Sequence, residues 1–344
     1  MTTWRSWVFA RWLRSKALPD GPTPRILTLT MNPAVDLSTS VTKMAPFTKM
    51  RCAQGHRDPG GGGINVARVL NRLGIDATAI YPVGGATGQL LISLVEREAV
   101  RSMIVAARNE TREDVTVFDE STHEQFRFVF PGAALSEMEW QQCLASIGLL
   151  TPAPAFVIAS GSLPPGVPEN FFGRVARACE GRSKVIVDTS GPRLRAALEH
   201  GGVYLIKPNL HEFMDLAGIS ASDDAALIEA ARDLIGRGQT GIVALSMGPE
   251  GALLITRDLA LRANGLPIDA VSVSGAGDSF LGAMVWSLVN DGCLETALRY
   301  AVAGGSAALL SPGTELCFPA DIHRLVTEVI VTPIVHPLPP RAGR

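Results

Sequence analysis

Short apolar runs alternate with longer amphipathic stretches from residue 25 onward. The runs rich in β-branched residues predict strands at residues 25–30, 77–81, 102–107, 155–160, 184–189, 203–207 and 241–246. Several have no polar face, which is typical of parallel strands covered by helices on both sides. Apolar residues recur at helical spacing over residues 64–73, 88–99, 136–148, 169–180, 222–237, 278–290 and 294–309. The alternation predicts a doubly wound, three-layer α/β/α sandwich.

Two segments break this alternation. Residues 36–58 and 113–130 contain no convincing helix, and residues 116–130 alternate in period two around a polar turn. That pattern predicts a hairpin with one solvated face. We therefore expect a small antiparallel sheet that projects from the core and serves as a lid, a dimer contact or both. The alternative is a surface hairpin without a function.

Composition narrows the class of protein. The chain has 344 residues, 47% of them hydrophobic and 19% charged, with a net charge of −2, as in a compact soluble globule. This charge argues against a dedicated nucleic-acid binder, and no apolar run reaches the roughly 18 residues of a membrane span. The five cysteines form no CxxC pair, so a reducing cytoplasm is the expected compartment.

The two ends differ from the rest of the chain. Residues 1–24 are rich in arginine and tryptophan. We expect a disordered extension or a start site placed too far upstream, with a targeting or membrane-surface helix as the alternative. Residues 331–344 are rich in proline and predict a loose tail. Residues 25–330 are expected to form a single domain with a lid that is discontinuous in sequence.

The most informative stretch is Val273–Phe280, because its glycines stand where a helix begins. The N–H groups of residues 275–277 lack intrahelical partners there, and with the helix dipole they can hold an anion such as a phosphoryl group in transfer. Asp278 stands beside them, where we expect an ionised carboxylate that accepts a hydroxyl proton at neutral pH. The alternative is an aspartate that only caps the helix.

A second stretch, Asp58–Arg68, places four consecutive glycines before an amphipathic helix. Glycines allow a backbone to approach a ligand closely. Neither GxGxxG nor GxxxxGK[ST] fits the spacing, which disfavours a Rossmann cofactor and a P-loop. Asn65 offers a donor and an acceptor to a polyol, and the alternative is a flexible loop.

Two further stretches follow predicted strands. Asn209 and Glu212 stand three residues apart where a helix begins, and an amide oxygen with a carboxylate suits Mg²⁺. The compatible alternative is a capping box. Residues 244–251 end a strand in a Gly-Pro turn that could hold adenine or phosphate.

In this order the stretches resemble the ribokinase-like carbohydrate kinases. The resemblance covers about residues 25–325 and rests on GGGGINVA, SVSGAGD and Asn209-x-x-Glu212. DPGGGGINVARVLNRLG, SGSLPPGV and SPGTELC are most similar to the minor, type II bacterial 6-phosphofructokinase branch. The resemblance implies a ribokinase-like fold and ATP-dependent, Mg²⁺-assisted phosphorylation of fructose 6-phosphate at its 1-hydroxyl, a glycolytic step. The alternatives are kinases of fructose 1-phosphate or tagatose 6-phosphate, and a non-catalytic sugar-phosphate sensor.

The resemblance also implies a role for each matching residue. Asp278 would be the base, and the N–H groups of Gly275, Ala276 and Gly277 would form the anion hole. The sugar would be held by Asp36, Gly61, Gly62, Asn65 and Ser160 or Gly161. The phosphate of the substrate would be held by Lys49 and Arg112, the latter from the same chain or from a partner's lid.

The remaining implied roles concern nucleotide, ions and assembly. The nucleotide would lie against Lys207, Asn209, Ser246, Gly248, Gly251 and Ser306. Glu212, with Asn209, would organise Mg²⁺ through water. A monovalent cation such as K⁺ would lie near Ser272, Ser274, Ala308, Ser311 and Gly313, although Val273 and Glu315 depart from the usual residues beside it. A homodimer through the lid sheet is expected.

Overall fold

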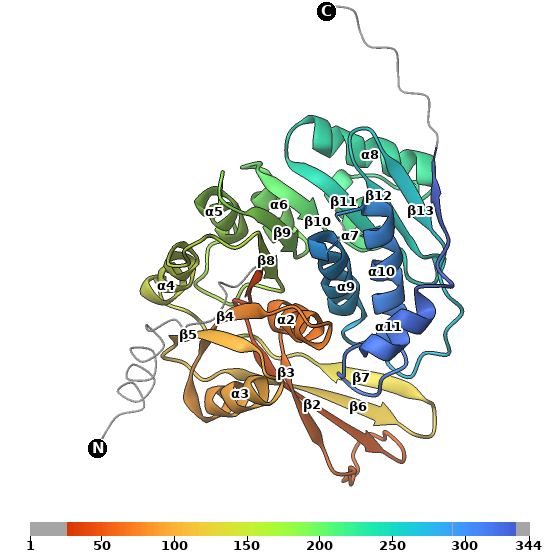
Figure 1. Cartoon of the computed structure of the whole chain (residues 1–344). Helices are drawn as coiled ribbons and strands as arrows, with labels where there is room; N and C mark the ends of the chain where they lie inside the picture. Colours follow the sequence, from red (N-terminus) through yellow and green to blue (C-terminus); the bar gives the residue numbers. More distant parts are fainter. Residues whose placement is uncertain (1–25, 291, 335–344) are drawn as a thin grey trace, which may run out of the picture.

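The computed structural model describes residues 26–290 and 292–334, which form two sheets (Figure 1). The larger, ten-stranded sheet contains seven parallel strands in the order β5-β4-β1-β8-β9-β10-β11. They are β5 (Arg101–Ala106), β4 (Ala77–Val83), β1 (Ile26–Leu29), β8 (Phe156–Ser160), β9 (Lys184–Asp188), β10 (Val203–Ile206) and β11 (Thr240–Ser246). These are the strands that the apolar runs predict.

The sheet continues beyond β11 with antiparallel strands that the sequence pattern did not predict. They are β12 (Ala252–Ile255), β13 (Ala260–Ala263) and β14 (Val331–Pro333). The expectation of a loose tail from residue 331 is therefore wrong for residues 331–333. Strand β13 offers a free edge there, and the Ile330 N–H donates to Asn264 Oδ1 at 2.6 Å, which holds the tail against it. The predicted extension at residues 1–24 and the tail beyond Ile334 lie outside the described residues.

Helices cover both faces of the large sheet, which confirms the predicted three-layer α/β/α sandwich. One face carries α2 (Gly62–Arg72), α3 (Gly85–Arg97), α9 (Ala276–Asn290), α10 (Leu294–Ala308) and α11 (Pro319–Leu325). The other carries α4 (Glu137–Gly148), α5 (Phe171–Ala178), α6 (Pro192–Leu198), α7 (Leu210–Ala217) and α8 (Asp224–Gly236). No helix in the described ranges is long and apolar enough to cross a membrane.

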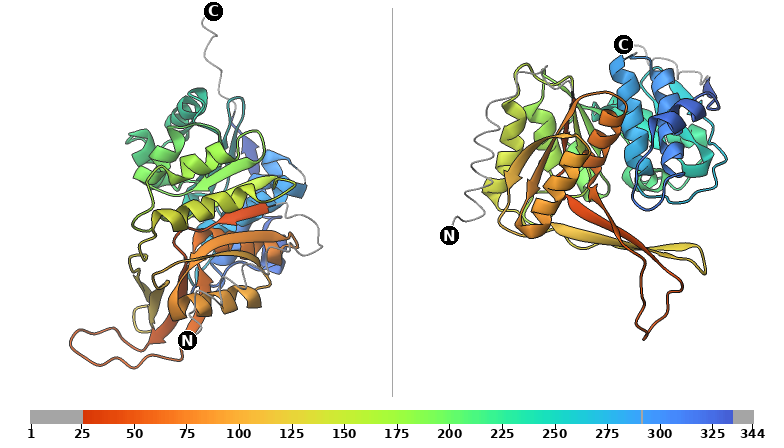
Figure 2. Two further views of the ribbon diagram at one scale, coloured as in Figure 1. Left: turned by 90° about the vertical axis from the view of Figure 1, so that its left-hand side faces the viewer. Right: turned by 60° about the horizontal axis from the view of Figure 1, so that its bottom comes forward.

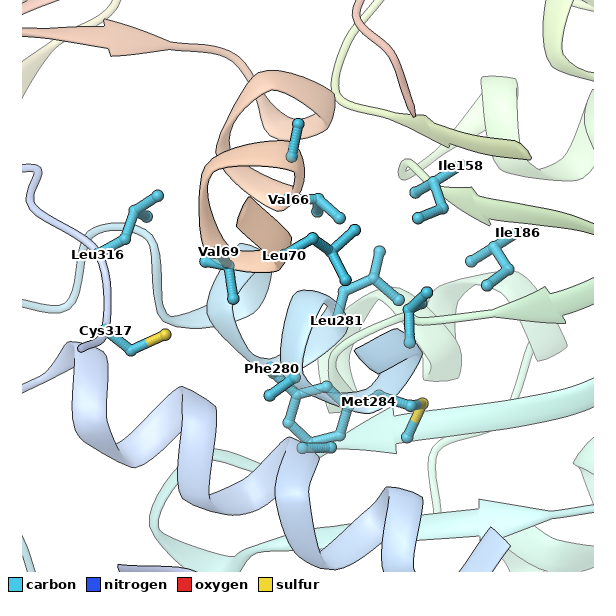
Figure 3. Packing of buried hydrophobic residues seen from close by; sticks show 14 of the residues in the cluster. Val66, Val69, Leu70, Ile158, Ile186, Phe280, Leu281, Met284, Leu316 and Cys317 are labelled. Carbon is cyan, nitrogen blue, oxygen red and sulfur yellow. The ribbon is translucent and has the colours of Figure 1, made fainter. Parts of the chain in front are cut away.

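Helix α9 is apolar on nearly all sides because it is enclosed by α2, α10 and the sheet (Figure 3). Leu281 and Met284 are fully buried, and Leu281 packs beside Leu70 of α2. Gly282 is required for this approach, since a Cβ there would lie 2.6 Å from a methyl carbon of Val69. Burying each large side chain contributes roughly 1.5–3 kcal/mol. The packing fixes the start of α9 relative to the glycine-rich start of α2.

The second sheet is a four-stranded lid that projects from the body, with the order β3-β2-β6-β7 (Figure 2). Its strands are β2 (Ala34–Val41), β3 (His56–Gly60), β6 (Arg112–Asp119) and β7 (Glu124–Phe128). Strands β6 and β7 confirm the predicted hairpin. The expectation of a purely antiparallel sheet is wrong, because β2 and β6 are parallel. Each follows a parallel strand of the large sheet, β1 and β5, and leaves the same edge in the same direction.

The two faces of the lid sheet differ in polarity. The register places Asp36 of β2 between Asp58 of β3 and Asp114 of β6, so that the three carboxylates form a row on one face. The adjacent positions put Val115 opposite Phe128 and Val117 opposite Phe126 on the other face. Thus the lid turns its charged face toward the body of the molecule.

Candidate functional site

A cavity of about 340 Å³ lies where the lid meets the large sheet. The last residues of β8 and β9, Ser160 and Asp188, line it, and so do the glycines that precede α2. Chain connections leave β1 and β8 toward opposite sides of the sheet, and such a switch point is where ligands bind in open α/β sheets. The cavity therefore has the position that the fold favours for a binding site.

The structure brings many of the expected site residues to this cavity. Those that line it are Asp36, Gly61, Gly62, Asn65, Arg112, Ser160, Gly161, Glu212, Ser274, Gly275 and Asp278. Lys49 lies in the exposed loop between β2 and β3 and does not line the cavity. Arg112 reaches the cavity of its own chain. The charged side chains of the lid and the glycine-rich starts of α2 and α9 thus line one cavity within a single chain.

Asp278 stands in the first turn of α9 and is only partly exposed, toward the cavity. Asn65 of α2 donates from Nδ2 to Asp278 Oδ2 at 2.8 Å. Burial raises the pKa of Asp278 to about 7, and the nearby carboxylates of Asp188 and Asp36 add to the rise, while Asn65 and Lys207 oppose it. The expectation of a carboxylate that stays ionised at neutral pH is therefore wrong. The group is half protonated near pH 7, as suits a proton acceptor.

The start of α9 offers the anion site that its glycines predict. Gly275 has a φ of 74°, a left-handed conformation that favours glycine, and turns the chain into the helix. The N–H groups of Gly275, Ala276 and Gly277 bond to none of the described residues. A Cβ at Gly277 would lie 3.4 Å from Lys207 Nζ, so a cation lies beside this helix start. Backbone donors, helix dipole and lysine together favour a negatively charged ligand.

Lys207 was expected only at the nucleotide, but it also interacts with Asp188 and Asp278. Its side chain is buried, and Nζ forms an ion pair with Asp188 Oδ1 at 3.2 Å. Although burial alone would lower it, the pKa of Lys207 is raised, because Asp188 and Asp278 stabilise its charged form. Asp188 Oδ2 also accepts from Ser160 Oγ at 3.1 Å. Lys207 is therefore held charged next to Asp278.

The lid supplies charges of both signs to the cavity. Burial and the neighbouring Asp114 raise the pKa of Asp36 to about 6, whereas Arg127 and Arg112 lower it. Arg112 Nη1 pairs with Asp114 Oδ2 at 3.0 Å and donates to the Phe130 carbonyl at 2.9 Å. Arg127, in contrast, forms no ion pair with any described residue. Two guanidinium groups thus face this end of the cavity, and one is free to bind an anion.

The glycines at the start of α2 allow neighbouring parts of the chain to approach closely. A Cβ on Gly62 would collide with Ser160 Oγ, and one on Gly61 would lie 2.6 Å from a methyl carbon of Thr30. Gly61 also has a φ of 112°, which side chains rarely adopt. Any larger residue at these two positions would therefore collide with Thr30 or Ser160 in the wall of the cavity.

Asn209 and Glu212 form the capping box that was the alternative to a metal site. Glu212 N donates to Asn209 Oδ1, and Asn209 N donates to Glu212 Oε2, both at 2.9 Å. Only Glu212 lines the cavity, together with Asp188. The described residues contain no cluster of three or more His, Cys, Asp and Glu side chains that could hold a metal. Two carboxylates fit Mg²⁺ that arrives with phosphates and keeps its waters.

Of the residues expected at the nucleotide and at the monovalent cation, Ser274 lines this cavity and the others do not. Asn209 pairs with Ser246 at the end of β11, beside the 3₁₀ turn η1 (Gly248–Glu250) and Gly251. Ser306 lies on α10, one residue after Gly305, where a Cβ would lie 3.4 Å from the Ala276 carbonyl at the start of α9. The residues expected at the monovalent cation also come together. Ser272 Oγ donates to the Gly313 carbonyl at 2.6 Å and accepts from Ser274 N, and Ser311 N donates to the carbonyl of Ala308 at the end of α10.

Sequence reasoning missed several residues of the cavity wall. They are Asp114, Arg127, Ser162, Asp188, Thr189, Ser190, Arg193 and Thr314. A signal was present for Asp188, which ends an apolar strand at the edge where ligands bind. Asp114 stands two residues from Arg112 on one strand and so shares its face. Thr314 belongs to the stretch SPGTELC, to which no cavity residue was assigned, and it reaches the cavity through a loop after α10.

Comparison with protein families and with known proteins gives a consistent result. A family model described as "pfkB family carbohydrate kinase" matches residues 29–321. ATP-dependent 6-phosphofructokinase isozyme 2 of Mycobacterium tuberculosis is 42% identical over 304 residues, with 88% of each chain covered. The protein of that name from Escherichia coli is 40% identical, with 88% and 97% covered. A 1-phosphofructokinase of Xanthomonas campestris is 31% identical, with 89% and 97% covered.

Solved structures agree with these sequence matches. Phosphofructokinase-2 from Escherichia coli in complex with potassium has a TM-score of 0.84 and 39% identity to this chain, with 88% and 98% of the two chains covered. The same protein in complex with fructose-6-phosphate has a TM-score of 0.83 and 38% identity at the same coverage.

Proposed function

This chain belongs to the pfkB family of carbohydrate kinases, and from that membership we propose that it transfers the γ-phosphoryl group of ATP to the 1-hydroxyl of fructose 6-phosphate. The proposed substrate class is inferred from the relatives named above that are 6-phosphofructokinases. The observation in this chain that supports it is the cavity with Asp278 at the start of α9 and two guanidinium groups, Arg112 and Arg127, on the lid. A base between a helix start and a pair of arginines fits an acceptor that is itself phosphorylated.

The chemical step follows from this geometry. Asp36, Asn65 and the glycines before α2 would hold the sugar hydroxyls, while Arg112 and Arg127 hold the phosphate on carbon 6. Asp278 would take the proton of the 1-hydroxyl as its oxygen bonds to the γ-phosphorus and the bond to ADP breaks. The N–H groups at the start of α9 and Lys207 would stabilise the charge on the moving phosphoryl group.

Nucleotide and ions would occupy the far side of the cavity. Asn209, Ser246, Gly248, Gly251 and Ser306 remain our proposed nucleotide contacts. Glu212, with Asp188 beside it, would hold a divalent ion through water, and that ion would neutralise charge on the triphosphate. The loops of Ser272 and Gly313 would hold a monovalent cation, which the potassium complex of the Escherichia coli protein supports.

The substrate assignment is tested by an acceptor panel. ADP release is measured with fructose 6-phosphate, fructose 1-phosphate, tagatose 6-phosphate, ribose and adenosine, and ³¹P NMR identifies the product. We expect the highest kcat/KM for fructose 6-phosphate and a 1,6-bisphosphate product. Equal or greater turnover of another acceptor would move the assignment to that substrate, and binding without turnover would favour a sensor.

The pH dependence of the reaction should follow the ionisation of Asp278. Its pKa is raised to about 7, so the protonated, inactive form persists up to neutral pH. We expect kcat/KM to fall about tenfold per pH unit below about pH 7 and to be constant above it. If kcat/KM instead falls below about pH 6, and does so equally in Asp278→Glu, the fall reports ionisation of the substrate's phosphate and not of Asp278.

We further propose that the apolar face of the lid binds a second copy of the chain. Phe126 and Phe128 of β7 are 37% and 46% exposed on that face, and Phe130 just beyond it is 51% exposed. Neighbouring exposed aromatic side chains on a projecting sheet are typical of an interface. A dimer through this face would leave the charged face of each lid to its own cavity.

The lid dimer is tested with Phe128→Glu. A buried carboxylate at the centre of the interface should convert a dimer to a monomer, measured by light scattering after size exclusion. Met138→Glu, at an exposed position on α4 away from the lid, is the control and should remain dimeric. If the wild type is monomeric, or Phe128→Glu stays dimeric, another surface joins the copies.

The reaction is proposed to occur in the cytoplasm. Three of the cysteines, Cys143, Cys179 and Cys317, are free thiols and are buried. Burial raises the pKa of the Cys179 thiol to about 11, so it stays protonated and unreactive. A chain of this kind is suited to a reducing compartment.

A further inference from the structure

Arg68 is a buried cation that no step described so far uses. It lies on α2, one helical turn after Asn65, and only 1% of its surface is exposed. Removing a guanidinium group from water is costly unless its donors are bonded. Its Nε is buried without a partner among the described residues, so the position of the group is set by its two terminal nitrogens.

These nitrogens bond in two directions. Toward the lid, Nη1 donates to the Pro59 carbonyl of β3 at 3.1 Å, and Nη2 lies 3.5 Å from Asp58 Oδ1. Asp58 Oδ2 in turn accepts from Thr314 Oγ1 at 2.9 Å. Arg68 therefore joins the lid strand next to Asp36 to the core.

Toward the catalytic centre, Nη1 also donates to Asn65 Oδ1 at 3.3 Å. Arginine has donors only, so the amide oxygen of Asn65 must face Arg68. The amide nitrogen then faces Asp278, to which it donates at 2.8 Å. A reversed amide would point its oxygen at the carboxylate and would repel the ionised base.

We propose that Arg68 is a positioning residue for the phosphoryl transfer: it fixes the amide of Asn65 so that its NH₂ group faces Asp278, and it makes this orientation depend on the docked lid strand β3. The proposal rests on the function proposed above. Glu98 at the end of α3 completes the arrangement, with Oε1 at 2.8 Å from Arg68 Nη2.

The test compares matched exchanges on one helix. Arg68→Lys keeps the charge but cannot bond Asn65, Pro59 and Glu98 together. Arg72→Lys is the control, because Arg72 also bonds Glu98, at 3.1 Å, and otherwise the carbonyls of Leu316 and Cys317, not Asn65 or β3.

The readout is the pH profile of kcat/KM, which a merely structural role would not shift. Besides Asn65, the groups that face Asp278 are Asp188, Lys207 and Asp36, and neither exchange alters them. Loss of the Asn65 bond raises the pKa of Asp278, so the acid limb should move up by about one pH unit in Arg68→Lys. We expect kcat/KM at pH 7 to fall about fivefold, since the ionised fraction of Asp278 drops from about one half to about one tenth, and Arg72→Lys to stay within twofold of wild type.

Other measurements keep the test independent of folding and of the assigned substrate. If Arg68→Lys does not fold, Arg68→Met with Glu98→Gln is compared with Arg72→Met with Glu98→Gln, since both pairs lose the same carboxylate. A ¹³C NMR titration of aspartate carboxyls, assigned with Asp278→Asn, reports the shift without any substrate. The proposal is overturned if the Arg68 variant keeps both the acid limb of kcat/KM and the Asp278 titration of the wild type. It is also overturned if the Arg72 variant shows an equal shift. If the wild type shows no turnover but the Asp278 titration is still shifted in the Arg68 variant, the proposed function is rejected and the positioning role of Arg68 is retained.

Discussion

Replacing Asp278 by asparagine is expected to lower kcat by about 10³-fold. The asparagine keeps the shape of the side chain but cannot accept the hydroxyl proton, and a positioned general base contributes about 10²–10⁴-fold to rate. Asn65 Nδ2, which donates to Asp278 Oδ2, would then face an uncharged amide. Steady-state assay of ADP release at saturating substrates measures the loss.

Binding should survive this change. Isothermal titration of Asp278→Asn with fructose 6-phosphate and with ATP should give dissociation constants within about fivefold of wild type, because the contacts that hold each ligand remain. Asp278→Glu is the second comparison: it restores a carboxylate one methylene too far along and should recover only part of the loss. Turnover of Asp278→Asn within tenfold of wild type would show that another group takes the proton.

Replacing Arg112 by glutamine is expected to raise KM for fructose 6-phosphate by about 10²-fold. The side chain is only 13% exposed and is held by Asp114 and two carbonyls, so it presents a fixed, charged donor to the phosphate of the sugar. Loss of a buried, hydrogen-bonded charge from a binding contact costs about 2–5 kcal/mol, of which a hundredfold change is about 2.7 kcal/mol.

The matched control for Arg112 lies in the same lid. Arg57→Gln on β3 also removes a guanidinium paired with a carboxylate, Glu113 at 3.0 Å, but Arg57 does not line the cavity. Titration with each ligand separately should show weaker sugar-phosphate binding and unchanged ATP binding in the Arg112 variant, and no change in the control. An equal loss for both ligands would mean that Arg112 supports the site as a whole.

The fold was predictable where the chain repeats a long pattern. Every parallel strand appears as an apolar run, because a strand covered on both faces must be apolar at successive positions. Helices α6 and α11 were not predicted, since seven residues are too few for a helical period to show. For α7 only its start at Asn209 and Glu212 was expected. Strands β12 to β14 were missed because strands of three or four residues are too short to show a pattern.

The site was predictable where its chemistry is local. Glycines before a helix and an aspartate in its first turn form an anion site and a base within a few residues, so the start of α9 could be recognised in the sequence. Asn209 and Glu212 likewise bond to each other within one helical turn. The sequence by itself thus determined which residues at these two helix starts can do the chemistry, but not Arg127 or Asp188.

The tertiary structure alone decided which of these residues meet and how strongly each is ionised. Asn65 and Asp278 are 213 positions apart, and Asp58 and Thr314 are 256 apart, yet both pairs are within 2.9 Å. The raised pKa of Asp278 depends on the burial and on the facing Asp188, which no local pattern reports. The same holds for Arg68, because the cost of burying its charge is offset only by partners from separate segments. Electrostatic energies depend on distance and solvent in three dimensions, and the order of residues along the chain specifies neither.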